Sequence, residues 1–375
     1  MQISANFDSG NITVIKANQP DNIELAINND HNSEFFQWFH FKLHNNQHVP
    51  HVINLVNAGQ SAYLQGWPDY QAVASYDRQY WFRVPTSFDG QTLTINFTPE
   101  FDTTYFAYFA PYSYERHQDL IHNAQLNQQC QLQVLGQTID GRDISLLKIG
   151  EDDKTKPVIW LTARQHPGET MAQWFIEGLL ERLFDEDDGI ARSLLNKAVF
   201  YIVPNMNPDG SVRGHLRTNA VGINLNREWQ TPSIENSPEV FFVREKMLAT
   251  GVDMFLDIHG DEAIPYNFLA GCEGVPSYSE KQQQLGQKFK AMLLAVTPEF
   301  QVEHGYPVNP PGQANLTIAA NWVGEHFSCL SYTIEMPFKD NFLLPDPQVG
   351  WSDERSRIFG KDVLTAIHHV VADLT

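Results

Sequence analysis

The sequence predicts an α/β protein in which a mixed, largely parallel sheet is flanked by helices and preceded by an N-terminal antiparallel β-sandwich. Short segments rich in β-branched and aromatic residues, separated by Gly, Asn, Asp and Pro, fill the N-terminal part and are typical of antiparallel strands. Beyond them, apolar strand patterns alternate with helical patterns, which favours a parallel sheet. The chain of 375 residues is long enough for two domains, which we place at residues 1–114 and 115–375.

The N-terminal region is predicted to contain several short strands with turn residues between them. Regular spacing of such strands indicates a sandwich of two sheets. The predicted strands are residues 35–43, 51–57, 79–85, 91–99 and 103–111.

The second region begins with a predicted helix at residues 113–126, where a serine precedes apolar residues at helical spacing. A strand pair follows at residues 130–140 and 144–150. The alternation continues with strand 157–163, helix 169–184, strand 198–204, helix 237–248 and strand 253–259. Such alternation brings the ends of several strands to one edge of a sheet, where open α/β sheets collect functional residues.

Charge and composition exclude several functional classes. The formal net charge is -20 and is spread over both predicted domains, so an overall negative field disfavours nucleic-acid binding. The chain has no run of about 18 apolar residues that could span a membrane, and its first residues lack the pattern of a secretory signal. Cys130, Cys272 and Cys329 are scattered and form no CxxC pair. We therefore expect a cytoplasmic protein with no nucleic-acid or membrane partner; its oligomeric state is unknown.

The first candidate site follows the predicted strand at residues 157–163. His166 and Glu169 stand in the segment ARQHPGE (163–169), on a turn that leads into a helix. Side chains at positions i and i+3 can converge there on one ion, and imidazole nitrogen and carboxylate oxygen are ligands of catalytic zinc. The pattern alone is weak, because a solvated histidine and a glutamate near the positive end of a helix show the same spacing.

Two further polar residues stand on later predicted strands. His259 ends the strand DMFLDIH (253–259), which presents a second imidazole at the same edge of the sheet. Glu335 lies in the apolar, β-branched segment YTIEMP (332–337), where burial of a carboxylate is costly unless it has a role. Each also has an ordinary explanation, namely a histidine satisfied in a turn and a buried glutamate paired with an arginine. Two imidazoles at strand ends of one sheet together favour a metal site.

These residues resemble the zinc metallocarboxypeptidase family, whose members are carboxypeptidase A-like, and in particular its cytosolic carboxypeptidase branch. Five motifs agree in kind and order: HPGE (166–169), NPDG (207–210), GINLNREW (222–229), DIHG (257–260) and TIE (333–335). Two N-terminal segments, FDSGN (7–11) and APYSY (110–114), are similar to the opening and closing segments of that branch's N-terminal domain. The resemblance covers nearly the whole chain.

The resemblance implies a hydrolase that removes the last residue of a peptide or protein. It implies one Zn²⁺ ion held by His166, Glu169 and His259. Zinc lowers the pKa of a bound water and polarises the scissile carbonyl. Glu335 would be the catalytic base that takes the proton from this water and passes it to the leaving amine.

Three more residues receive roles from the resemblance. Arg217 is the candidate for stabilising the oxyanion. Asn226 and Arg227 would hold the terminal carboxylate of the substrate, because a guanidinium matches a carboxylate in a bidentate way. The ordinary explanation of Arg227 is a surface ion pair with Glu228.

One residue departs from the family pattern. Asn224 stands where the family usually places an aspartate that accepts the N–H of the first zinc-binding histidine. Asparagine can accept this hydrogen bond but brings no charge. We expect a working metal site that is weaker within the ~10–100-fold range of such changes.

The sequence leaves two features of the family unassigned. A mobile tyrosine precedes the catalytic glutamate in the pancreatic-type enzymes, and here Tyr306 and Tyr332, the tyrosines of residues 304–334, stand in no recognisable motif. A glutamate-binding pocket would need a basic residue at its floor. Arg164, Arg213 and Lys339 lie near the motifs, but the sequence places none of them in a pocket, so the preferred C-terminal residue stays open.

Three other interpretations fit the sequence. A related zinc hydrolase that cleaves small acylated amino acids shares the ligands and the base, although the preceding sandwich and the NPDG and NREW motifs favour the peptidase. A binding protein with an inactive peptidase fold is expected to lack a ligand or the base, and all four residues are present. The N-terminal region could be an independent binding module, although packing against the catalytic domain is the stronger expectation.

Overall fold

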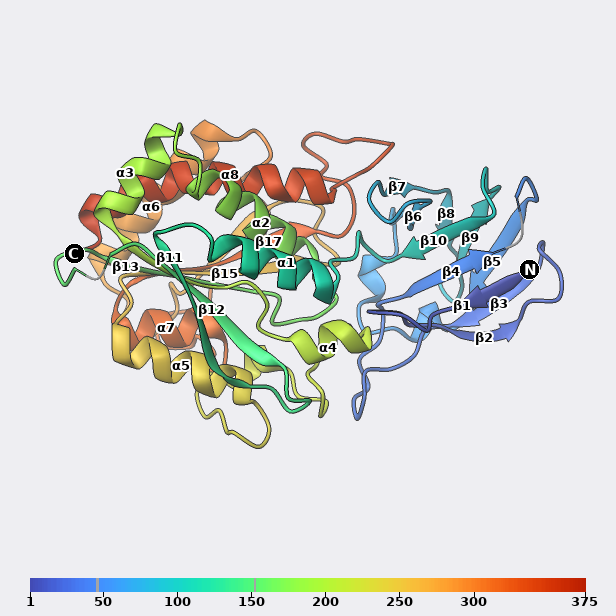
Figure 1. The fold of residues 1–375 in the computed structure, drawn as a ribbon, viewed down its shortest axis with the longest axis horizontal. Helices are drawn as coiled ribbons and strands as arrows, with labels where there is room; N and C mark the ends of the chain where they lie inside the picture. Colours follow the sequence, from blue (N-terminus) through green and yellow to red (C-terminus); the bar gives the residue numbers. More distant parts are fainter. Residues whose placement is uncertain (45–46, 152) are drawn as a thin grey trace.

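The N-terminal region forms two five-stranded sheets in the computed structural model, which describes residues 1–44, 47–151 and 153–375 (Figure 1). The first sheet is antiparallel throughout, in the order β1 (Gln2–Ser4), β4 (His40–His44), β10 (Thr103–Ala107), β6 (Val73–Ser75) and β7 (Phe82–Arg83). The second has the order β2 (Thr13–Lys16), β3 (Ile23–Ala26), β5 (His51–Leu55), β9 (Leu93–Phe97) and β8 (Thr86–Phe88). Its strands are antiparallel except that β3 and β5 pair in parallel. The predicted sandwich is confirmed.

Alternation of side chains along the strands builds the core of this sandwich. Ile53 and Leu55 on β5 are fully buried and point to the same face, as residues two apart in a strand must. Across the core, the rings of Phe97 on β9 and Phe106 on β10 meet edge to face, with centroids 5.4 Å apart. Two short 3₁₀ helices, η1 (Ala58–Gln60) and η2 (Leu64–Gly66), connect β5 to β6.

All five predicted strands of this region are shorter in the structure, and two of them differ most from the prediction. The segment 35–43 becomes a strand only at His40. The segment 79–85 forms a strand only at Phe82–Arg83, because the Asp77 carboxylate accepts hydrogen bonds from the Gln79 and Tyr80 amides and turns the chain there. Aromatic content alone therefore overestimates strand length.

The second region is built on a seven-stranded mixed sheet. Its order is β11 (Cys130–Gln137), β12 (Asp143–Ile149), β14 (Val199–Val203), β13 (Val158–Ala163), β15 (Met254–Asp261), β17 (Leu330–Pro337) and β16 (Phe268–Gly271). The central strands β14, β13, β15 and β17 run parallel, whereas the edge strands pair in antiparallel fashion. The predicted α/β class is confirmed.

Helices cover both faces of this sheet, as Figure 1 shows. One face carries α1 (Tyr114–Ala124), α2 (Met171–Leu183), α3 (Gly189–Lys197), α6 (Glu280–Val296) and α8 (Asp353–Val370). The other carries α5 (Pro238–Thr250) and α7 (Ala319–Phe327). Strand β13 serves both layers, because Ile159 and Leu161 pack in the core of the first face and Trp160 in that of the second. Both layers are needed to cover the apolar strands.

Short helices complete the fold, and several helices lie outside the segments predicted from sequence. The short ones are α4 (Pro208–Arg213), η3 (Leu225–Arg227) and η4 (Val371–Asp373). Among the unpredicted helices, α6 begins with a capping box in which Ser279 and Gln282 satisfy each other's backbone amides. Helix α8 begins at the cap Ser352, whose side chain accepts from the Arg355 amide. The capping residues that mark the starts of α6 and α8 can therefore be recognised in the sequence.

The two regions are joined through a continuous hydrophobic core. Tyr108 of the N-terminal region stacks on Phe338, with ring centroids 4.6 Å apart. The carbonyl of Ala110 accepts hydrogen bonds from the Thr170 hydroxyl at 2.8 Å and the Trp174 indole at 3.0 Å. These contacts fix the N-terminal region against the start of α2, which is the helix that follows the predicted metal motif.

A buried glutamate outside the candidate site makes stability depend on pH. Burial of Glu239 on α5 raises its pKa from 4.5 to about 8, and its Oε1 has no hydrogen-bond partner within the described part of the chain. As pH rises, the unfolded chain loses this proton before the folded chain does. The contribution of the protonated Glu239 to the free energy of unfolding is therefore complete below the unfolded pKa of 4.5 and is lost as pH rises through about 8. We expect Glu239→Gln to raise the melting temperature at pH 8 and to change it little near about pH 5. Equal shifts at both pH values in thermal melts would contradict this assignment.

Candidate metal centre and substrate cavity

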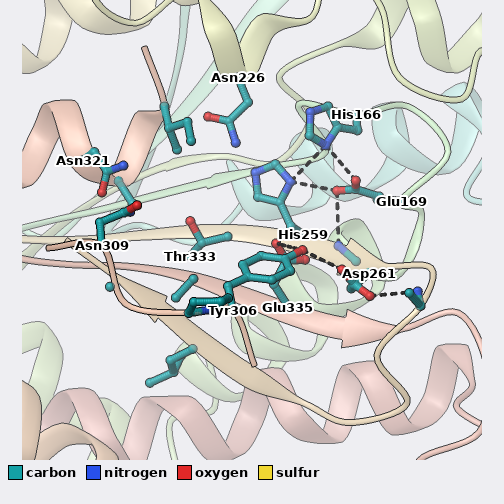
Figure 2. A pocket seen from close by; sticks show the side chains of 18 of the residues that line it. His166, Glu169, Asn226, His259, Asp261, Tyr306, Asn309, Asn321, Thr333 and Glu335 are labelled. Atoms are coloured by element: carbon teal, nitrogen blue, oxygen red, sulfur yellow. Dashed lines mark hydrogen bonds and ion pairs between the residues drawn. The ribbon is translucent and has the colours of Figure 1, made fainter. Parts of the chain in front are cut away.

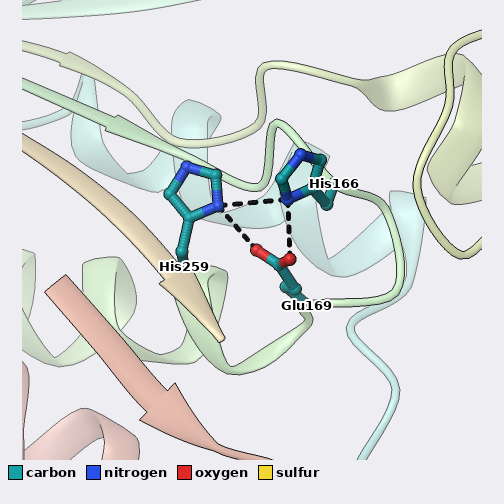
Figure 3. A group of neighbouring side chains, drawn as sticks. All are labelled: His166, Glu169 and His259. Atoms are coloured by element: carbon teal, nitrogen blue, oxygen red, sulfur yellow. Dashed lines mark hydrogen bonds and ion pairs between the residues drawn. The ribbon is translucent and has the colours of Figure 1, made fainter. Parts of the chain in front are cut away.

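The three predicted metal ligands meet at the carboxyl edge of the central parallel strands. His166 and Glu169 lie in the loop between β13 and α2, and His259 lies on β15. Because β13 and β15 are parallel neighbours, with Ala163 opposite Ile258, the ends of the two strands bring these side chains together. Figure 3 shows the two rings and the carboxylate turned toward a common point.

The geometry of this cluster fits a metal site. The Nδ1 atoms of His166 and His259 are 3.2 Å apart. The two oxygens of Glu169 lie 2.6 Å from Nδ1 of His166 and 2.7 Å from Nδ1 of His259. All three side chains are buried, and one donor atom of each lies within 4.8 Å of the others. Two imidazole nitrogens and one carboxylate are a donor set of catalytic zinc sites that retain an open position.

The electrostatics of the cluster also suit a cation. Burial and the nearby Arg217 lower the pKa of His166 to about 4, so its ring is neutral. At His259 burial is outweighed by the carboxylates of Asp257 and Glu169, which raise its pKa well above the ordinary value. The two carboxylates thus favour positive charge at this point, as a bound metal ion requires.

The outer nitrogen of each histidine is held by a different kind of acceptor. Nε2 of His259 lies 2.8 Å from a carboxylate oxygen of Asp257, whereas Nε2 of His166 lies 3.0 Å from the amide oxygen of Asn224. Such contacts orient a ligand ring and raise its basicity, and a carboxylate does so more strongly than an amide. The contact expected for Asn224 is therefore made, with the uncharged partner.

This difference predicts the effect of one substitution on metal binding. Asn224→Asp is expected to tighten zinc binding by up to about 10–100-fold, because a carboxylate would then hold His166 as Asp257 holds His259. Zinc competition titrations on chelator-stripped protein measure the change. The matched control is Asp257→Asn, which should weaken binding; unchanged affinity in Asn224→Asp would sink the idea of a weakened site.

The loop that carries His166 and Glu169 is held by a buried arginine. Arg164 is 1% exposed and adopts a left-handed backbone conformation with a φ of 58°. Its guanidinium donates to the carbonyl of Pro167 at 2.9 Å and to the carbonyl of Tyr112 at 2.8 Å. A left-handed non-glycine residue is uncommon and persists only where its surroundings hold it. Arg164 therefore shapes the loop and does not line the cavity.

A cavity of about 370 Å³ opens beside the ligand cluster and collects the other candidate residues (Figure 2). Glu335 on β17 is paired in register with His259 on β15, so the two side chains project from adjacent strands. Its Oε2 is buried and has no hydrogen-bond partner among the residues that the structure describes. The buried arginine partner of the ordinary explanation is not found in that part of the chain. All seven candidate residues line this cavity: His166, Glu169, Arg217, Asn226, Arg227, His259 and Glu335.

The residues proposed to hold a carboxylate lie together at η3. The side-chain oxygen of Asn226 accepts from the Ala319 amide at 2.8 Å. This bond leaves the Asn226 amide nitrogen as the donor available to the cavity. Arg227 donates from Nη1 to the Asn226 carbonyl at 2.6 Å. Within the described residues Arg227 forms no ion pair with Glu228, whose carboxylate accepts a hydrogen bond from the Ser237 hydroxyl instead.

Two models of known protein families match this chain, one in each of its regions. The model of the zinc carboxypeptidase family matches residues 120–356. The chain belongs to this family. The model of the cytosolic carboxypeptidase N-terminal domain matches residues 3–109, as the resemblance to the cytosolic branch predicted.

Solved structures of related proteins have very similar folds. A metallo-carboxypeptidase from Pseudomonas aeruginosa, in complex with (2-guanidinoethylmercapto)succinic acid, is 52% identical with a TM-score of 0.98, over 100% of both chains. A metallo-carboxypeptidase from Burkholderia cenocepacia is 49% identical with a TM-score of 0.97, also over 100% of both chains. Cytosolic carboxypeptidase 1 of Mus musculus is 28% identical over 72% of this chain and only 26% of its own length, so this carboxypeptidase spans about a quarter of that relative. Within the described residues no helix is long and apolar enough to cross a membrane.

The structure places one tyrosine of the carboxypeptidase that the sequence left unassigned. The Tyr306 hydroxyl donates to Asp261 at 2.5 Å and lies 3.4 Å from Oε1 of Glu335 (Figure 2). Tyr306 stands in the connection between α6 and α7, which has no motif around it. Tyr332, the other candidate, is buried on β17 and stacks on Phe289. Only the tertiary path of the chain distinguishes the two.

None of the three basic residues named for substrate selection lines the cavity. Arg213 pairs with Asp140, and Lys339 donates to the Gln65 carbonyl at 2.8 Å. Instead, Glu273 and Lys290 line the cavity and form an ion pair at 3.1 Å. The cavity lining therefore contains a charged pair of opposite sign in place of those three residues.

Proposed function

We propose that this metallocarboxypeptidase hydrolyses the C-terminal peptide bond of peptides or proteins with one zinc ion bound. The observation that carries the proposal is the shared cavity, in which a zinc-type ligand cluster, an unpartnered carboxylate and carboxylate-binding donors face one space. His166, Glu169 and His259 would hold the ion, which supplies a Lewis acid and lowers the pKa of bound water.

Glu335 is proposed to move the proton in this reaction. Glu335 lines the cavity, and its buried Oε2 has no partner within the described chain, so this oxygen is free to accept a hydrogen bond from the attacking water. The same oxygen would take the proton and return it to the nitrogen of the leaving amino acid. The Tyr306 hydroxyl lies 3.4 Å from the other oxygen and can orient the carboxylate.

The hydrogen-bond donors of Asn226 and Arg227 are proposed to make the enzyme an exopeptidase. Asn226 and Arg227 would bind the free carboxylate of the last residue, which an internal residue of a peptide does not offer. The Pseudomonas aeruginosa relative is in complex with (2-guanidinoethylmercapto)succinic acid, a compound with carboxylates at one end and a guanidino group at the other. A carboxylate-bearing ligand in a relative of this similarity supports the same assignment here.

The test is release of C-terminal amino acids from a mixed peptide library by the zinc-loaded enzyme. We expect release of single terminal residues, lost after chelation and restored by zinc. Internally cleaved fragments would contradict an exopeptidase. If the zinc-loaded enzyme released nothing from any peptide but cleaved small acylated amino acids, the proposal would fail in favour of a deacylase.

The pair Glu273 and Lys290 predicts how the preference for the last residue can be changed. Lys290→Met leaves the Glu273 carboxylate without its partner and is expected to raise kcat/KM for C-terminal Arg or Lys relative to Glu. Glu273→Gln is expected to change the ratio in the opposite direction. A charged hydrogen bond is worth about 1.5–3 kcal/mol, or roughly tenfold to a hundredfold in the ratio. Paired peptides that differ only in the last residue measure it, and equal ratios in both variants would exclude this pair from selection.

The proposed function is accompanied by assignments of the domain boundary, the cellular location and the substrate partner. We propose that the two domains are residues 1–114 and 115–375, with the boundary in the first turn of α1 (Tyr114–Ala124). A cytoplasmic location is supported by the three free cysteines at Cys130, Cys272 and Cys329, since no disulfide joins them in the described structure. The substrate partner is the C-terminus of a peptide or protein.

A further inference from the structure

A carboxylate of the N-terminal region binds the loop that carries Arg217. Asp30 is 2% exposed and lies between β3 and β4. Its Oδ1 accepts from the Leu216 amide at 2.6 Å, and its Oδ2 accepts from the Arg217 amide at 2.8 Å and the Thr218 amide at 2.9 Å. The Thr218 hydroxyl adds a fourth bond at 3.0 Å. Three consecutive amides thus converge on one side chain from the other region.

These amides depend on Asp30 because the loop has no regular structure. Residues 215–219 lie between α4 and η3, outside any helix or strand. Within the described residues, the amides of Leu216, Arg217 and Thr218 make no hydrogen bond except to Asp30. Buried amides without partners are costly, so the loop keeps this shape only while the carboxylate is present.

The side chain of Arg217 is also placed by the N-terminal region. Its guanidinium lies 5.5 Å from the ring centre of Phe35 and 5.4 Å from that of Tyr63. These aromatic contacts orient the guanidinium without using its N–H groups. In the described structure the guanidinium makes no hydrogen bond to protein, so its donors remain available to a substrate in the cavity.

The same loop is tied to the metal motif. The Leu216 carbonyl accepts from the Gly168 amide at 2.8 Å, between the two metal-binding residues of the HPGE segment. A second contact, from the His31 amide to Nε2 of His215 at 3.1 Å, reinforces the junction. Asp30 is therefore linked through Leu216 to Gly168, and these hydrogen bonds set the position of Arg217 relative to the HPGE segment.

We propose that Asp30 is a positioning residue for Arg217, so that the N-terminal region completes the active site of the carboxypeptidase. This inference rests on the proposed function and on the role that the family resemblance gives Arg217, which is to stabilise the developing oxyanion. A displacement of about 1 Å in a catalytic group can cost roughly 100-fold in rate. Loss of the carboxylate should therefore lower kcat and leave zinc content and substrate binding largely unchanged.

The test is a double-mutant cycle in the full-length, zinc-loaded enzyme. Asp30→Ala is expected to lower kcat by roughly tenfold to a hundredfold, and Asp30→Asn by less, because its amide oxygen still accepts. In an Arg217→Met background, Asp30→Ala should cause no further loss, because both changes remove the same contribution. The control Arg83→Met breaks another contact between the regions, the 3.4 Å ion pair with Asp340, and should keep the wild-type kcat.

Each outcome of this cycle decides the question. A lower kcat with unchanged KM, and no further loss in the double variant, supports the positioning role. Losses that multiply in the double variant, or an effect on KM and melting temperature alone, overturn it and leave Asp30 a structural residue. If Asp30→Ala does not fold, the milder Asp30→Asn decides by the same criteria. If the wild-type enzyme is inactive on every peptide, the proposed function is contradicted as well. If the wild type is active and the Asp30 variants have wild-type kcat, only this inference is contradicted.

Discussion

Glutamine in place of Glu335 is expected to lower kcat for peptide hydrolysis by about 10²–10⁴, the usual contribution of a general base. The substitution keeps the shape of the side chain on β17 but removes its ability to take a proton. The proposed metal ligands are untouched, so zinc content should stay at the wild-type level. Steady-state kinetics on the best library peptide, together with metal analysis, measure both quantities.

The matched control for this change is Glu239→Gln. It makes the same chemical substitution at a buried glutamate on α5 that does not line the cavity. We expect its kcat to equal that of the wild type. A Glu335→Gln enzyme with wild-type kcat and bound zinc would remove Glu335 from the proton path.

Methionine in place of Arg217 is expected to lower kcat by about 10²–10³, the usual cost of losing one oxyanion donor. The guanidinium lines the cavity and leaves its donors to the substrate, because its contacts to Phe35 and Tyr63 are through the rings. An interaction made only in the transition state changes kcat and kcat/KM equally. Both constants should therefore fall together while KM stays the same.

A neighbouring arginine provides the control for this prediction. Arg213 ends α4 four residues earlier and pairs with Asp140 on the surface. Arg213→Met should leave kcat unchanged, because surface ion pairs contribute little. A rise in KM with constant kcat in Arg217→Met would instead assign this arginine to substrate binding.

The candidate residues that could be predicted from the sequence are those in short motifs at strand ends. His166 and His259 follow or end apolar strands, and adjacency of parallel strands then brings them together. The structure gathers them with Glu169 and Glu335 around one cavity, while their roles stay proposals. Helices α6 and α8 begin at the capping residues Ser279 and Ser352, so their starts could also be predicted from the sequence.

The remaining features depend on contacts between residues far apart in the chain. Tyr306, Glu273 and Lys290 reach the cavity from the chain between β15 and β17, and no local pattern marks them. Asp30 meets its partner amides 186 to 188 residues later in the chain. Similarly, the parallel pairing of β3 with β5 follows from the order of strands in the sheet, which hydrophobic periodicity does not encode.

The in-register pairing of β15 with β17 has a consequence for enzyme engineering. Because His259 faces Glu335 across two hydrogen-bonded strands, the spacing between the proposed metal site and the proposed proton acceptor is set by the backbone of the sheet. The residues proposed to select the substrate, Glu273 and Lys290, lie after β16 and on α6, outside those two strands. Directed evolution confined to these outer segments could therefore generate carboxypeptidases with new substrate ranges while the hydrolytic chemistry is inherited intact.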